Sequence, residues 1–130
     1  MAVEYSGLDI SFTAAESLTA MQYRFVVQAT DTTVRMANAG TDFPIGILQN
    51  APASGETAVV RIDGTSKLAM NAAVAVGAQL KCEYVGAADN GKGDAADTDY
   101  DIVRGICIKA SGAEDDVGAV KMAAYVLMVA

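Results

Sequence analysis

The chain has 130 residues, of which 52% are hydrophobic and 19% charged, with a formal net charge of −7 and a pI of about 4.3. This length predicts one domain with one core, and the high apolar fraction excludes an intrinsically disordered chain. The nine basic residues are scattered singly. Because phosphate binding needs a positive patch, we expect neither nucleic acid nor an anionic membrane as a partner.

Short β-prone runs alternate with turn clusters about every ten residues, which is typical of an all-β sandwich or barrel. Residues 8–12 alternate apolar and polar, as a half-buried strand does. Thr13 and Glu16 then match a capping box, which starts either one helical turn through Met21 or a β-turn. The strands predicted next are 23–29 and 33–37, joined as a hairpin through Asp31-Thr32, followed by 45–49 and 57–62.

Asp63-Gly64 predicts a tight hairpin turn before a strand at 66–70. Residues 72–77 stay open between a short helix and a turn. Residues 86–99 are the most polar stretch, and we expect an exposed, mobile loop there. The remaining predicted strands are 80–85, 102–109 and 120–130, with an acidic loop at 111–116.

Two apolar strands are each interrupted by a glycine, Gly46 and Gly105, and each is followed by a small-residue loop and another strand. The pattern predicts two similar hairpins, each with a bulge or a close backbone approach at its glycine. Chance similarity between common β-turn sequences is the alternative.

Catalytic constellations are scarce in this sequence. It contains no histidine, which removes the commonest general base and every Ser-His or Cys-His dyad. Cys82 and Cys107 belong to no CxxC motif, and isolated cysteines in apolar strands are more often buried thiols than a disulfide, although pairing stays open. No phosphate-binding glycine motif occurs. We therefore expect no enzyme activity and no cofactor.

The acidic stretch from Asp89 to Asp101 invites a calcium interpretation but fails the EF-hand template. Asp94 stands where that loop needs glycine, and Tyr100 stands where it needs glutamate. A solvated loop is the favoured interpretation, so no metal ligand is predicted. A weak cation site or a host-ligand site in this loop stays open.

Three segments carry a family resemblance. They are residues 4–16 (EYSGLDISFTAAE), residues 43–56 (FPIGILQNAPASGE) followed by 59–64 (VVRIDG), and residues 105–110 (GICIKA). These segments resemble the small capsid cement, or head-decoration, proteins of tailed bacteriophages. The resemblance implies a single compact β-barrel-like or β-tulip-like domain that binds the major capsid protein on the outer surface of the head, usually as a homotrimer. Synthesis in the host cytoplasm is expected, because the N-terminal segment lacks the apolar region of a secretory signal.

Within this scheme we expect an extended N-terminal arm at residues 1–12 and a β-domain at residues 13–130, with at most one or two short helical turns. The capsid-attachment candidates on the arm are Tyr5, Leu8, Asp9, Ile10 and Phe12. Such a segment can add as a strand to a neighbour's sheet. The alternative is that it is the first strand of the domain. The trimer-interface candidates, which are otherwise core residues, are Val126, Leu127 and Met128.

A carbohydrate- or host-surface-binding β-module on the virion is the alternative function. Sugar binding favours exposed aromatic rings for stacking. Three Phe, five Tyr and no Trp argue against it.

Overall fold

The computed structural model describes residues 5–39, 42–84, 86, 88–96, 101–112 and 117–126, without the side chains of residues 125 and 126. Within these residues the chain forms strands and no helix, so the all-β prediction is confirmed. The described residues contain no helix that could span a membrane. The strands are β1 (Gly7–Ala14), β2 (Phe25–Gln28), β3 (Thr33–Met36), β4 (Gly46–Leu48), β5 (Thr57–Ala69), β6 (Gln79–Cys82), β7 (Gly93–Ala95), β8 (Ile102–Lys109) and β9 (Val117–Val126).

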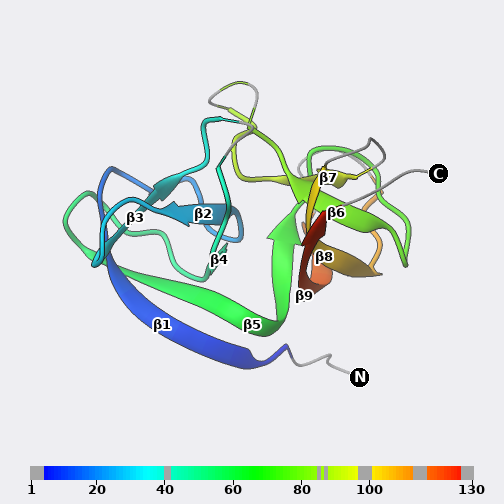
Figure 1. The fold of residues 1–130 in the computed structure, drawn as a ribbon, viewed down its shortest axis with the longest axis horizontal. Helices are drawn as coiled ribbons and strands as arrows, with labels where there is room; N and C mark the ends of the chain where they lie inside the picture. The colour runs from blue at the N-terminus through cyan, green and yellow to red at the C-terminus, as the bar shows by residue number, and fades with distance from the viewer. Residues whose placement is uncertain are drawn as a thin grey trace.

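The strands form one sheet in the order β1-β3-β2-β4-β5-β9-β8-β6-β7. Strand β1 also pairs with β5, so the first five strands close into a ring. The β1–β3 pairing is parallel and the other strand pairings are antiparallel. Figure 1 shows the ring on one side of the molecule and β6 to β9 on the other, with β5 running between them.

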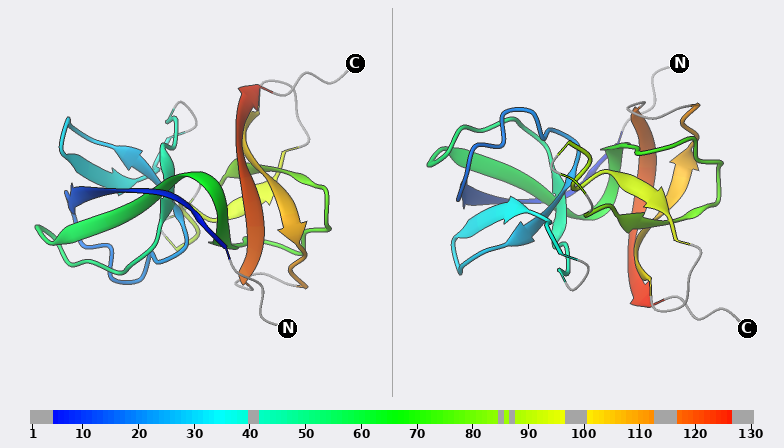
Figure 2. Two further views of the ribbon diagram at one scale, coloured as in Figure 1. Left: turned by 90° about the horizontal axis from the view of Figure 1, so that it is seen from below. Right: turned by 90° about the horizontal axis from the view of Figure 1, so that it is seen from above.

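Strand β5 is 13 residues long and belongs to both groups of strands (Figure 2). Its first half pairs with β1 and β4, and its second half, from Thr65, pairs with β9. The hairpin predicted at Asp63-Gly64 is therefore wrong. Gly64 does adopt a positive φ of 96°, which is the conformation that an Asp-Gly pair signals. Here that conformation bends one continuous strand. In a hairpin the two halves of β5 would pair with each other, whereas here the first half pairs with β1 and the second with β9.

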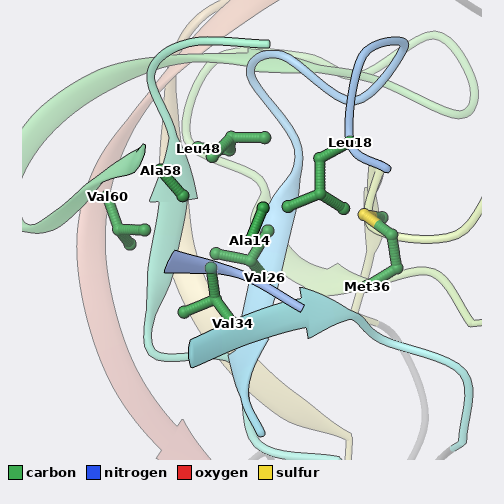
Figure 3. Packing of buried hydrophobic residues seen from close by; sticks show 8 residues of the cluster. All are labelled: Ala14, Leu18, Val26, Val34, Met36, Leu48, Ala58 and Val60. Carbon is green, nitrogen blue, oxygen red and sulfur yellow. The ribbon is translucent and has the colours of Figure 1, made fainter. Parts of the chain in front are cut away.

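Buried apolar side chains form two cores, so the prediction of a single core is wrong. The first core fills the ring (Figure 3) and contains Ala14, Leu18, Val26, Val34, Met36, Leu48, Ala58 and Val60. The second core contains Phe25, Ile47, Leu68, Met70, Val74, Leu80, Cys107 and Val120. Because side chains alternate along a strand, β2 and β4 send neighbouring residues into different cores. Both strands are consequently apolar on both faces, and they form a wall between the cores.

Two sequence expectations fail in the connecting segments. The capping-box pattern at Thr13 starts no helix, because β1 continues to Ala14 and the Thr13 N–H donates to Thr32 O at 2.8 Å. Part of the loop expected at residues 86–99 is strand β7, which pairs with β6, and Lys92 immediately before it is only 3% exposed. The Lys92 ammonium reaches the Asp89 carboxylate at 2.7 Å, which allows a charged residue to be buried. Residues 87 and 97–99 of this segment lie outside the described part of the chain.

The two interrupted strands do form similar hairpins, β4–β5 and β8–β9, with a close approach at each glycine. A Cβ atom at Gly46 would collide with the carbonyl group of Arg61 on β5. A Cβ atom at Gly105 would collide with the Val120 side chain on β9, next to a register shift between Val103 and Gly105. The glycine prediction is therefore confirmed in both hairpins.

Candidate attachment surface on strand β1

Strand β1 has one paired edge and one open edge. It pairs with β5 from Gly7, opposite Gly64, to Thr13, opposite Thr57. On its other side it pairs with β3 only at Thr13 and Ala14. Among the described residues, no strand covers the other edge of residues 7–12, so this edge is available for pairing with another chain. The segment predicted as an arm thus lies, from Gly7 onward, in the domain's own sheet.

Three of the predicted attachment residues share one face of β1. Phe12 packs against the first core, whereas Ile10 is 40% exposed and Leu8 is 57% exposed. The apolar face of the strand therefore starts at the core and continues out into solvent. Leu8 and Ile10 are the residues on this face that can contact a partner without rearrangement of the domain.

Asp9 has a partner within the chain. Its carboxylate accepts hydrogen bonds from Arg61 Nε at 2.7 Å and from Arg61 Nη2 at 3.1 Å. Arg61 Nη1 also donates to the carbonyl groups of Tyr5 and Thr65. This arginine joins the start of β1 to the bend of β5, and Asp9 is therefore placed to hold the strand in register.

Tyr5 lies apart from Leu8 and Ile10. It is half-buried and lines a pocket of about 210 Å³. The other lining residues are Tyr23, Lys67, Lys109, Val117 and Gly118. Tyr5 thus lines a pocket that neither Leu8 nor Ile10 lines.

The predicted trimer-interface residues lie at the end of the described chain. Val126 is the last residue of β9 and pairs with Ile102 on β8. Its side chain, together with Leu127 and Met128, lies outside the described residues, so their role stays a prediction.

Neither cysteine has the properties of a nucleophile. Cys82 and Cys107 are free thiols that pack in or against the second core. Burial raises the pKa of Cys82 to about 12 and also raises the pKa of Cys107, which disfavours the reactive thiolate. Within the described residues, no group of three or more His, Cys, Asp or Glu side chains could hold a metal ion.

One electrostatic feature that the sequence did not reveal is a clamp between Arg35 and Asp42. The Asp42 carboxylate accepts hydrogen bonds from Arg35 Nη2 at 2.9 Å and Nη1 at 3.0 Å, and from the backbone N–H groups of Asn38 and Ala39. The bonds from Arg35 are the main reason that the pKa of Asp42 falls from 3.8 to about 2. The clamp fixes the segment that leads to Phe43.

Because the pKa of Asp42 is lowered by folding, the clamp stabilises the fold above about pH 4 and is lost as the pH falls towards 2. Partial exposure of the pair reduces the effect to about 1–2 kcal/mol. We expect Asp42→Asn to lower the free energy of unfolding by this amount at pH 7 and to remove the corresponding loss between pH 4 and 2. Urea denaturation at pH 7, 4 and 2 measures the free energy of unfolding of Asp42→Asn and of the unmodified protein. Asp31→Asn in the exposed β2–β3 turn is the control. An unchanged acid dependence in Asp42→Asn would contradict the role of the clamp.

The whole described architecture can be compared with solved structures. The fold is shared with the base of a bacteriophage head fibre. The crystal structure of the head fiber gp8.5 N base in bacteriophage phi29 superposes with a TM-score of 0.68 at 15% sequence identity. The match covers 94% of this chain and 98% of that chain. At this identity the likeness shows a common fold.

No protein-family model and no curated protein matches the chain. Membership of the cement family, which the three sequence segments suggested, is therefore not shown by these comparisons. It stays part of the proposal below.

Proposed function

We propose that the chain is a non-enzymatic structural protein of a tailed-bacteriophage head, which binds the outer surface of the expanded shell as a trimer and stabilises it. The observation that carries this proposal is the fold, which is shared along almost the full length of both chains with a phage head-fibre base. The resemblance of residues 4–16 and 43–56 to cement proteins supports the same class of function.

Stabilisation of the shell follows from linkage. A protein that binds the assembled shell and not the separated subunits shifts the equilibrium towards the shell. A trimer placed where several coat subunits meet would bridge them, and many weak identical contacts would act together.

In this proposal, β1 attaches to the shell as a strand of the domain's own sheet. The segment is paired with β5, so it presents an open strand edge instead of a free arm. Backbone hydrogen bonds along residues 7–12 would supply affinity, and the exposed side chains of Leu8 and Ile10 would supply specificity.

We expect Leu8→Asp and Ile10→Asp to weaken co-sedimentation with expanded shells that lack the protein by about tenfold or more, since each places a charge in an apolar contact. Both residues are exposed, so circular dichroism and Tm should stay close to those of the unmodified protein. Val76→Asp is the matched control, because Val76 is an exposed apolar residue (68%) outside β1. This control should bind shells normally.

The outcomes separate two parts of the proposal. Normal shell binding by both β1 variants would refute attachment through β1 and leave the structural role intact. Failure of the unmodified protein to bind shells would refute the structural role, and binding to host cells and glycans would then be measured. Deleting residues 2–12 is a poorer test, because it removes most of a strand of the ring.

A further inference from the structure

Arg104 on β8 is a buried arginine to which the described residues give no anionic partner. The residue is 6% exposed, and its buried Nε atom has no hydrogen-bond partner within the described part of the chain. None of the ion pairs among the described residues includes it. Burial lowers the pKa of this guanidinium, in keeping with a charge that is desolvated and not neutralised.

The contact that the described residues do give Arg104 is aromatic. Its guanidinium carbon lies 4.5 Å from the centre of the Phe43 ring. An aromatic ring offers the N–H donors of arginine no oxygen acceptor, so this contact leaves them available to a carboxylate. Phe43 is itself 51% exposed and follows the Arg35–Asp42 clamp, which positions it.

Arg104 lines a pocket built by irregularities in two strands. On β9, Ala123 and Ala124 both lie opposite Arg104, because Val103 pairs with Tyr125 while Gly105 pairs with Met122. On β5, Ile62 is the extra residue where β1 shifts register. Bulges of this kind redirect side chains and open space beside the sheet. The pocket has a volume of about 170 Å³ and is lined by Ile62, Asp63, Arg104, Met122, Ala123 and Ala124.

We propose that Arg104 binds a carboxylate supplied from outside the chain. A guanidinium matches a carboxylate in planar, bidentate geometry, and the ion pair would neutralise the buried charge. The pocket is smaller than the roughly 300–1,000 Å³ of sites for drug-sized ligands, so it suits one acidic side chain or a small free carboxylate. The carboxylate of Asp63, at the same pocket, accepts a bond from the Gly64 N–H at 2.9 Å and makes no ion pair with Arg104.

Thermal denaturation in propionate, an analogue of the glutamate side chain, tests this proposal, with chloride at equal ionic strength as the reference. We expect the Tm of the unmodified protein to rise by a few degrees once propionate exceeds its Kd about tenfold. Arg104→Met should show no such rise. Without propionate its Tm should equal or exceed that of the unmodified protein, because methionine removes an unpaired buried charge and keeps a contact with Phe43. Lys121→Met, an exposed cation on β9, is the control and should respond to propionate normally.

An equal response of Arg104→Met and the unmodified protein would overturn the proposal. A large fall in the Tm of Arg104→Met without ligand would also overturn it, since the guanidinium would then serve the fold. If propionate raises the Tm of the unmodified protein but not that of Arg104→Met, two further measurements identify the source of the carboxylate. They are co-sedimentation with shells and the mass of the protein in solution. Loss of shell binding or of an oligomer by Arg104→Met assigns an acidic side chain of a neighbouring protein, and no change in either assigns a free carboxylate.

Discussion

Replacing Gly46 by alanine is expected to lower the free energy of unfolding by about 3 kcal/mol or more. The new Cβ atom would meet the backbone carbonyl of Arg61 and the Val60 side chain. The carbonyl cannot withdraw unless the β4–β5 pairing opens, and that pairing lines both cores. Urea denaturation followed by circular dichroism measures the loss.

Gly55→Ala is the matched control for this substitution. Gly55 has a positive φ of 84°, but apart from its two chain neighbours no residue has an atom within 4 Å of the position that a Cβ would take. Its replacement should cost only the backbone strain, about 1 kcal/mol. Equal losses in the two variants would show that the close approach at Gly46 is relieved by a small movement, and the steric argument would fail.

Phe25→Ala is expected to cost about 3–5 kcal/mol, because the ring is completely buried in the second core. The loss should appear as one transition of the whole domain. Phe25 and its neighbour Val26 face different cores, so loosening β2 weakens both. Far-ultraviolet circular dichroism and tyrosine fluorescence should therefore report the same midpoint.

Phe43→Ala provides the control with the same change of residue type. The Phe43 ring is half exposed and its contact is the Arg104 guanidinium, so a loss of about 1 kcal/mol or less is expected. Two separated transitions in Phe25→Ala would contradict the shared wall and would show that the cores unfold independently.

The sequence predicted strands well where local patterns decide them. The apolar run that became β2 reflects burial on both faces of the strand, which the sequence pattern records directly. The alternation in residues 8–12 predicted a strand correctly, but the half-burial expected of it is wrong, because residues 7–11 are exposed and Phe12 is only partly buried. Gly46 and Gly105 were also predictable, because a glycine inside an apolar strand has few other uses. The bend at Gly64 was not predictable, since a positive φ serves a hairpin and a bent strand equally well. The choice depended on β1 and β9, which lie far away in the chain.

The candidate sites also differ in whether local sequence or distant parts of the chain decide them. Leu8 and Ile10, which were selected from a terminal, alternating segment, are exposed, and their role in attachment stays a prediction. Arg104 was missed because it appears in the sequence as one charged residue within an apolar strand, next to Gly105. Its isolation arises from the opposing Ala123 and Ala124 and from Phe43, which is more than fifty positions away in the chain. The sequence does show a single arginine in one apolar strand and two small residues in the next. Only the register between β8 and β9 reveals that these small residues lie opposite the arginine.

The double role of β5 has a consequence for synthesis on the ribosome. All pairings of the five-stranded ring lie within residues 7–64, so the ring can close while later residues are still being translated. Until Val117–Val126 emerges, Thr65–Ala69 then extends from a finished ring as an uncovered strand. Chains that stop early would expose this edge to one another, and association between nascent or truncated copies is the hazard that such an edge creates.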